Sequence, residues 1–177
     1  MQRPICSVFI ATSVDGCIAR PDGRIDFLDG VQLEGEDYGF AAFYASVDAL
    51  VMGRGTWDVV NAFPEWPYEG KRVVVLTDRP AEPRRGETIA SGGVVSLLER
   101  LHAEGVRRVY VDGGVVIRQF LAAGVVDDLV LSVIPVILGD GVRLFGAGVP
   151  ELSLTLVESR SWPTGLVQLR YQRTWRT

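Results

Sequence analysis

The sequence is poor in the side chains that bind transition metals, because it contains one histidine, His102, and two cysteines, Cys6 and Cys17. Zinc sites need three or four such ligands close together, so a zinc protein is excluded. A disulfide between Cys6 and Cys17 is one alternative. Both residues lie in apolar surroundings and nothing in the chain signals export, so we expect reduced thiols instead.

Long apolar runs are also missing, and no secretory leader precedes the first expected strand. We therefore expect a cytoplasmic protein without a membrane partner. Lysine is nearly absent, since Lys71 is the only one and arginine supplies the rest of the positive charge. Arginine is the better ligand for a phosphate group, because its planar guanidinium forms two parallel hydrogen bonds. The net charge of −4 argues against a nucleic-acid-binding protein.

The length and the hydrophobic content suit one globular unit. We expect the 177 residues to form a single domain, and the hydrophobic fraction of 47% leaves some apolar surface beyond the core. Apolar residues gather late in the chain, at Val130, Val133, Ile134, Val136 and Ile137. This surplus predicts a homodimer with two-fold symmetry, which is the commonest closed assembly.

Strand-like and helix-like segments alternate along the chain. We expect strands at residues 5–11, 17–19, 49–52, 72–76, 109–111 and 129–134, and helices at 36–46, 56–61, 95–104 and 115–123. Residues 152–160 and 166–174 are expected to form two antiparallel strands. This order predicts a mostly parallel α/β sheet with helices on both faces and an antiparallel C-terminal edge.

Two turns between a strand and a helix have the composition of phosphate-binding turns. Residues 112–114 are Asp-Gly-Gly, and their glycines would let a ligand approach bare backbone beside a helix start that favours anions. Residues 53–56 are Gly-Arg-Gly-Thr, where Arg54 would stand beside free N–H groups and Thr56 could cap the helix. The alternative for residues 53–56 is a plain helix start with a solvated arginine.

Polar residues elsewhere have both a functional and a structural interpretation. Thr77, Asp78 and Arg79 follow the strand 72–76, and ligands of open α/β sheets bind at the carboxyl ends of strands. The alternative is a polar turn before Pro80. Asp37 falls in the first turn of the expected helix 36–46, where an acid usually offsets the helix dipole.

Taken in order, these segments resemble the dihydrofolate reductase fold, above all its bacterial branch related to the reductase domain of the riboflavin-biosynthesis deaminase-reductase. The residues that carry the resemblance are 9–19, 48–57, 73–77, 112–114 with 120–121, and 134–145. It implies a three-layer fold and an NADPH-dependent reductase that transfers hydride to a C=N or C=O group of a small, ribosylaminopyrimidine-like substrate. Dihydrofolate reductase activity and a nucleotide-binding protein without turnover are the alternatives.

The resemblance also implies the residues of the cofactor site. Ala11 and Ile18 would meet the nicotinamide, Gly53, Arg54, Gly55 and Thr56 the phosphates, Thr77 and Arg79 the adenosine ribose, and Gly113, Gly114, Val115 and Val116 the pyrophosphate and nicotinamide. The family has a cis peptide between adjacent small residues, which would fall at Gly113 and Gly114. NADPH is expected and NADH stays open, because Asp78 would repel a 2′-phosphate whereas Arg79 would attract it.

Folate reductases bind the pterin with a carboxylate on the first helix, and Asp37 falls at that place. The resemblance therefore makes Asp37 the predicted catalytic residue, with Asp15 and Asp26 as weaker candidates near the same mouth. The arginine that grips the folate tail has no equivalent, since residues 60–63 stand there instead. Folate is thus not expected as the main substrate. Riboflavin-type relatives are dimers, which agrees with the homodimer expected above.

Overall fold

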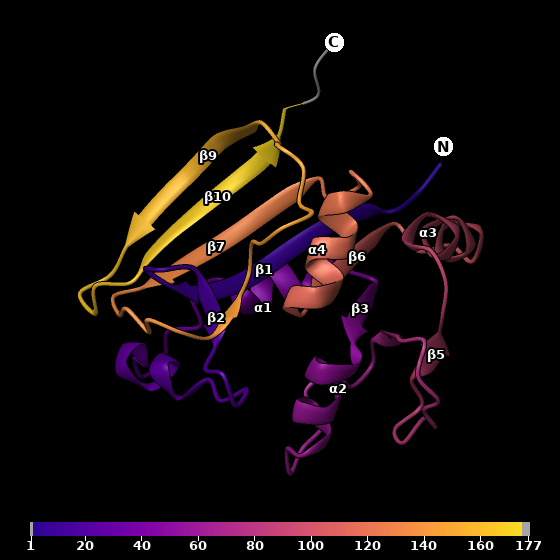
Figure 1. The fold of residues 1–177 in the computed structure, drawn as a ribbon, viewed down its shortest axis with the longest axis horizontal. Helices are drawn as coiled ribbons and strands as arrows, with labels where there is room; N and C mark the ends of the chain where they lie inside the picture. The colour runs from indigo at the N-terminus through magenta and orange to yellow at the C-terminus, as the bar shows by residue number, and fades with distance from the viewer. Residues whose placement is uncertain (1, 175–177) are drawn as a thin grey trace.

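An eight-stranded sheet forms the centre of the protein in the computed structural model, which describes residues 2–174 (Figure 1). In spatial order its strands are β5 (Thr88–Ala90), β4 (Arg72–Leu76), β3 (Ala49–Gly53), β6 (Arg108–Asp112), β1 (Ile5–Ser13), β7 (Asp128–Ile134), β10 (Val167–Arg173) and β9 (Leu154–Ser161). All pairs from β5 to β7 are parallel, and β10 runs antiparallel to β7 and β9. The expected sheet with its antiparallel C-terminal edge is confirmed.

Helices cover both faces of this sheet. They are α1 (Phe40–Ala45), α2 (Arg54–Asn61), α3 (Val94–Ala103) and α4 (Gly114–Ala122), with a short 3₁₀ helix, η1 (Asp26–Val31). Helices α3 and α4 share one hydrophobic core with Val51 of β3, whereas α1 and α2 share another with Leu50 and Met52. Strand β3 is buried on both faces, which explains why nearly all of its residues are apolar.

The strand order brings the carboxyl ends of β3 and β6 together. From β3 the chain continues outward to β4 and β5, and it returns through α3 to β6 on the other side of β3. Met52 near the end of β3 is paired with Asp112 at the end of β6. Open α/β sheets bind ligands at the edge where successive connections diverge in this way.

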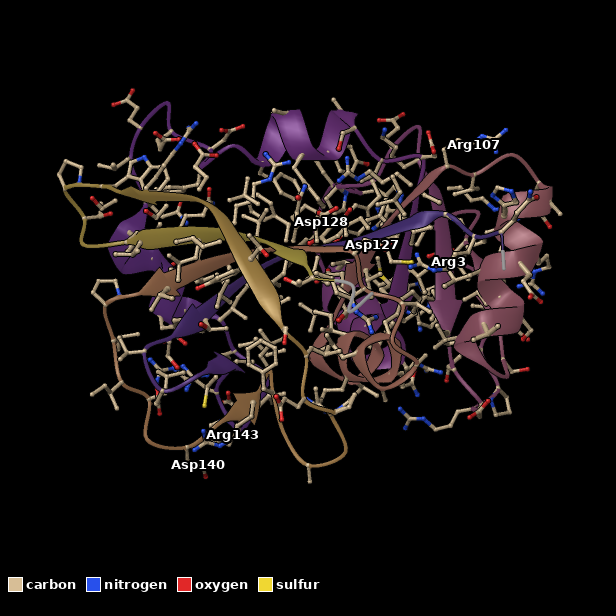
Figure 2. All side chains as sticks on the ribbon, turned by 90° about the horizontal axis from the view of Figure 1, so that it is seen from above. Arg3, Arg107, Asp127, Asp128, Asp140 and Arg143 are labelled. Atoms are coloured by element: carbon tan, nitrogen blue, oxygen red, sulfur yellow. The ribbon has the colours of Figure 1, made fainter. Side chains whose placement is uncertain are left out.

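Ion pairs hold the opposite end of the sheet, where the parallel strands begin. Arg3 donates two hydrogen bonds to the carboxylate of Asp127, at 2.6 and 2.7 Å, and Arg108 donates one to Asp128 at 2.7 Å. Figure 2 shows Arg3 beside Asp127 and Asp128. Paired charges of this kind are compensated within the protein, so this end has a structural role.

A second, smaller sheet lies outside the main one. Strand β2 (Cys17–Ala19) pairs antiparallel with β8 (Val142–Arg143), and we call this unit the β2–β8 ribbon. The sequence did not predict β8, β5 or η1, which are too short to leave a periodic pattern. The other elements agree with the expected ranges to within about two residues, apart from α1.

The expected helix 36–46 was wrong at its start, because α1 begins at Phe40. Gly35, Tyr38 and Gly39 have φ values of 77°, 56° and 82°. These positive values belong to the left-handed region, which interrupts a right-handed helix. Asp37 therefore lies in the turn before the helix and not within it.

Three further findings concern the cysteines, membrane-spanning helices and metal ligands. Cys6 and Cys17 are buried free thiols, as expected. No helix within residues 2–174 is long and apolar enough to cross a membrane. The same stretch of chain holds no group of three or more histidine, cysteine, aspartate or glutamate side chains placed to bind a metal ion.

Candidate functional site

The turn between β6 and α4 has a backbone that only glycine can adopt at Gly113. Its φ and ψ are 89° and 134°, which side chains rarely allow. A Cβ atom at this position would overlap Oγ1 of Thr56, which lies at the start of α2. The missing side chain therefore leaves bare backbone facing the start of a neighbouring helix.

The start of α2 meets the same turn. Gly53 ends β3 and is the N-cap of α2, and a Cβ atom on it would lie 3.1 Å from a methyl group of Val116 in α4. Gly113 is the N-cap of α4, so both helices begin at a residue without a capping side chain. Two helix N-termini with unpaired N–H groups converge here, which is an arrangement suited to an anionic group.

Arg54 is held at this edge by three contacts. Its guanidinium pairs with Asp58 at 3.0 Å, donates a hydrogen bond to the carbonyl oxygen of Pro80 at 3.2 Å, and lies over the ring of Trp57 at 5.1 Å. The Trp57 indole N–H donates to the buried Glu87 at 2.7 Å, which fixes the ring. Arg54 is thus a fixed cation next to the free N–H groups of α2.

The polar residues after β4 lie at the same edge of the sheet, because β4 is the parallel neighbour of β3. Thr77 accepts a hydrogen bond from the backbone N–H of Arg79 at 3.2 Å. Asp78 accepts one from the backbone N–H of Gly92 at 3.5 Å. The side chain of Arg79 is exposed, and within residues 2–174 it forms no ion pair that would compete with an incoming anion.

The β2–β8 ribbon closes the other side of the glycine turn. A Cβ atom on Gly114 would lie 2.8 Å from Cδ1 of Ile18 and 3.6 Å from the carbonyl oxygen of Arg143. Of the two valines that follow, Val115 is 60% exposed and Val116 is buried. Ala11 is half-buried in β1, beside the core under η1. The structure thus brings the turns 53–56 and 113–116 and Ile18 together at one edge.

The expected cis peptide is not present, since the described residues 2–174 contain none. The open backbone at this turn comes instead from the positive φ of Gly113.

Asp112 belongs to the predicted glycine turn, but the sequence predicted no role for its side chain. It ends β6 immediately before the glycine turn and accepts a hydrogen bond from the N–H of Gly113 at 2.8 Å. Burial raises its pKa to about 6, although the Gly113 N–H and the Tyr110 hydroxyl act in the opposite direction. An acid at the carboxyl end of a parallel strand is the signal that could have identified it.

Aromatic rings line the face of the sheet on which Asp112 lies. Tyr110 is two residues earlier in β6, so the two side chains point to the same face. The Tyr110 ring lies 5.1 Å from Phe43 of α1, and Phe9 lies 5.0 Å from Phe43 and 5.4 Å from Phe40. Asp112 thus shares a face of the sheet with an aromatic cluster, which it meets through the Tyr110 hydroxyl.

Asp37 uses both carboxylate oxygens to begin α1. Its oxygens accept the backbone N–H groups of Gly39 and Ala41, each at 2.8 Å. These bonds, that of Ala41 first, lower the pKa of the exposed carboxyl group. This is the helix-start alternative, and a catalytic role for Asp37 stays a prediction.

The two weaker candidates are also engaged. Asp26 pairs with Arg20 at 2.6 Å, and this hydrogen bond lowers its pKa. Asp15 accepts hydrogen bonds from Ser13 and from the backbone N–H groups of Leu138 and Gly139, and the first of these is the main reason that its pKa falls to about 2. Carboxyl groups with lowered pKa values are ionised at neutral pH, so neither can donate a proton there.

Comparison with known proteins gives one family and a group of related structures. Residues 4–168 match the RibD C-terminal domain family. The chain is 34% identical to the uncharacterized protein YwjB of Bacillus subtilis, over 94% of this chain and 96% of YwjB. A protein from Shewanella sp. PV-4, whose name provisionally assigns it to riboflavin biosynthesis, superposes with a TM-score of 0.91 at 38% identity and covers 97% of this chain and 99% of its own.

A more distant structure shows the fold alone. Dihydrofolate reductase from Enterococcus faecalis has a TM-score of 0.64 at 17% identity, over 96% of each chain. The expected dihydrofolate reductase-like fold is therefore confirmed.

Proposed function

Because this chain belongs to the RibD C-terminal domain family, a family of NADPH-dependent reductases, we propose that it is itself such a reductase. It would transfer hydride to a C=N or C=O group of a small polar compound. The observation that carries the proposal is the glycine turn at Gly113, where a Cβ would overlap Thr56 between two uncapped helix starts. The free N–H groups of the two helix starts place partial positive charge beside that turn, which suits the pyrophosphate of a dinucleotide.

Each part of the cofactor would contact different residues at the carboxyl ends of the strands. The free N–H groups at residues 53–56, with Arg54, would hold phosphates, and residues 113–116 would lie under the pyrophosphate and nicotinamide. Ile18 and Ala11 would border the nicotinamide, while Thr77 and Arg79 would meet the adenosine ribose. We propose NADPH as the preferred cofactor, because Arg54 and Arg79 offset the repulsion of a 2′-phosphate by Asp78.

Asp112 is the proposed proton source. Bound NADPH supplies the hydride that the substrate carbon receives, and the nitrogen or oxygen of the same double bond must take up a proton. A carboxyl group with a pKa of about 6 is protonated in part of the molecules at neutral pH. Asp112 also lies next to the turn that would carry the nicotinamide, whereas Asp37 uses its oxygens in the cap of α1.

The proposed substrate class is a ribosylaminopyrimidine or a related small heterocycle. The half-buried rings of Phe9 and Phe43, which lie over the buried Tyr110, offer flat surfaces on which such a ring could stack. The test measures NADPH binding by calorimetry and then NADPH oxidation with a panel of ribosylaminopyrimidines, pterins and dihydrofolate. A protein that binds no NADPH refutes the proposal. One that binds NADPH but oxidises it with no compound would be the nucleotide-binding alternative.

Removal of the Arg54 side chain is expected to weaken NADPH binding at least tenfold. A charge-assisted hydrogen bond to phosphate contributes about 1.5–3 kcal/mol. Calorimetric titration of Arg54→Ala measures the loss. Asp58→Asn is the matched control, because it removes the ion-pair partner and keeps the guanidinium, so its affinity should equal or exceed that of the wild type. Equal NADPH affinity in Arg54→Ala and wild type would remove Arg54 from the site.

We also propose a homodimer. Of the late apolar residues from which it was expected, Val130 and Ile134 are buried in the single chain and Ile137 is 72% exposed; Leu154, Leu156 and Val167 are exposed as well. Leu154 and Leu156 lie on β9, the edge strand of the sheet, whose backbone groups on one side have no neighbouring strand. Exposed apolar residues on a free edge favour pairing with a second copy.

Light scattering is expected to give a mass twice that of the 19.4 kDa chain. Leu156→Glu should produce a monomer, because it puts a charge in the apolar patch. Thr155→Glu places the same charge on the opposite face of β9 and should leave the dimer intact. A wild-type mass of one chain at micromolar concentration contradicts the dimer.

A further inference from the structure

The β2–β8 ribbon forms one wall of the proposed dinucleotide site. Its strands pair through Cys17 with Arg143 and Ala19 with Val142. A Cβ atom on Gly114 would lie only 2.8 Å from Cδ1 of Ile18 and in ordinary contact, at 3.6 Å, with the carbonyl oxygen of Arg143, so both strands of the ribbon lie against this glycine. A shift of the ribbon would therefore change the space around the glycine turn directly.

A single carboxylate joins the two halves of the chain that build this ribbon. Asp15, in the turn before β2, accepts the Ser13 hydroxyl at 2.7 Å and the backbone N–H of Leu138 at 3.0 Å on one oxygen. Its other oxygen accepts the N–H of Gly139 at 2.8 Å, in the loop before β8. More than a hundred residues of sequence separate Asp15 from these two donors, so the bonds fix tertiary structure.

The ribbon is also tied to α4. Arg143 of β8 donates a hydrogen bond to the backbone carbonyl oxygen of Asp15 at 3.0 Å, and its own carbonyl oxygen accepts one from Arg118 of α4 at 2.6 Å. The N–H of Leu144 donates to the carbonyl oxygen of Gly16 at 2.9 Å. Hydrogen bonds thus lead from the Asp15 turn through β8 to the helix that begins at the glycine turn.

We propose that Asp15 is a positioning residue, which holds the β2–β8 ribbon against the Gly113–Gly114 turn and so slows the release of the bound dinucleotide. The identity of the ligand rests on the proposed function, but the contacts of Asp15 do not. Both of its oxygens are occupied by donors from the protein, so it holds structure and transfers no proton. Because the ribbon is already ordered in the free protein, less free energy is lost in ordering it when the ligand binds.

Asp15→Asn is the variant that tests this role. It keeps the size of the side chain but replaces one acceptor oxygen with an N–H₂ group, which then faces a backbone N–H of Leu138 or Gly139. Asp140→Asn is the matched control, because Asp140 is in the same loop and accepts only the N–H of the adjacent Gly141, at 2.8 Å. Figure 2 shows Asp140 close to Arg143, at the ribbon.

Two measurements distinguish a role of Asp15 in holding the ribbon from a role confined to its own turn. Amide hydrogen exchange without ligand should become about tenfold faster at Leu138 and Gly139 in Asp15→Asn, and also at Leu144, which reports on the ribbon itself. Stopped-flow measurement should show NADPH leaving about tenfold faster, with the association rate changed less than about twofold. Asp140→Asn should match the wild type in both measurements.

The proposal is overturned if exchange at Leu144 is unchanged, since the ribbon would then be held without Asp15. It is equally overturned if Leu144 exchanges faster but the NADPH dissociation rate stays that of the wild type. A wild-type protein that binds no NADPH at all would refute the proposed function, and the dissociation part of this proposal with it, whereas the exchange data would still decide whether Asp15 positions the ribbon. Should Asp15→Asn not fold, Ser13→Ala takes its place; it removes one bond to Asp15 and the oxygen that accepts the Cys17 N–H, so the exchange at Leu138 and Gly139, with a smaller expected effect, reports on Asp15.

Discussion

Gly113→Ala is expected to weaken NADPH binding about 100-fold, the larger of the losses at the cofactor site. A Cβ atom would overlap Oγ1 of Thr56, so the turn and the start of α2 must move apart. A displacement of about 1 Å in a positioning element can cost about two orders of magnitude. The backbone conformation, with φ of 89°, adds strain of about 1–3 kcal/mol for any residue other than glycine. Calorimetric titration measures the affinity, and thermal unfolding measures the loss of stability.

Gly30→Ala is the matched control for this variant. Gly30 has an ordinary φ, and a Cβ atom there meets nothing within 4 Å. Its substitution should leave NADPH affinity and stability near the wild-type values. If Gly113→Ala loses stability but binds NADPH as tightly as Gly30→Ala, the turn is only a structural feature and the dinucleotide lies elsewhere.

Asp112→Asn is expected to lower turnover about 10²- to 10⁴-fold while NADPH affinity stays within about twofold. Asparagine keeps the acceptor oxygen for the Gly113 N–H but has no proton to donate at the pH of the assay. In the wild type, turnover should decrease as pH rises through about 6, because the carboxyl group loses its proton. The residual turnover of the variant should not depend on this ionisation. Initial rates of NADPH oxidation across pH measure both effects.

Asp37→Asn is the comparison variant, since Asp37 is the acid that the sequence favoured. Asparagine keeps one acceptor oxygen, so one of the two bonds to the N–H groups of Gly39 and Ala41 is lost; this should destabilise the protein by about 0.5–2 kcal/mol and leave turnover nearly normal. The opposite pattern, with turnover lost in Asp37→Asn and kept in Asp112→Asn, would exchange the roles of the two residues.

The stability of Asp112→Asn provides a second test with a defined sign. The pKa of Asp112 is raised, so the folded protein binds more protons than the unfolded chain between about pH 4 and pH 6. The free energy of unfolding of the wild type should therefore decrease as pH rises through that range, by about 1–3 kcal/mol, and level off above it. Asparagine has no such ionisation, so the variant should gain stability relative to the wild type toward neutral pH. Urea unfolding of both proteins across this range measures the difference.

Local patterns predicted most of the fold. The apolar residues 73–76 of the expected strand 72–76 are typical of a strand buried on both faces, and β4 has these bounds with its apolar side chains in two different cores. The prediction of a helix over 36–46 was wrong at its start, because the apolar spacing begins only at Phe40. The two glycines before Phe40, Gly35 and Gly39, adopt left-handed φ values. Hydrophobic periodicity indicates which residues are buried, but it does not indicate where the backbone adopts the positive φ angles that end a right-handed helix.

The acids of this chain show where such patterns fail. The resemblance makes Asp37 the candidate proton donor and Asp15 a weaker one, and local sequence does not reveal whether a carboxylate already has partners. Asp15 finds two of its partners at Leu138 and Gly139, far along the chain. Asp112 looked like a turn residue, and burial within the fold raises its pKa.

The sequence by itself determined the order of strands and helices and the two glycine turns, because period, burial pattern and glycine are local properties of the chain. The tertiary structure decided which turns face each other. Gly113 meets Thr56 because β6 pairs with β3, and Ile18 reaches Gly114 because β2 pairs with β8. It also decided which carboxyl group keeps its proton, because a pKa depends on the water and the charges that surround the group in space, and these are set by strand pairing and helix packing.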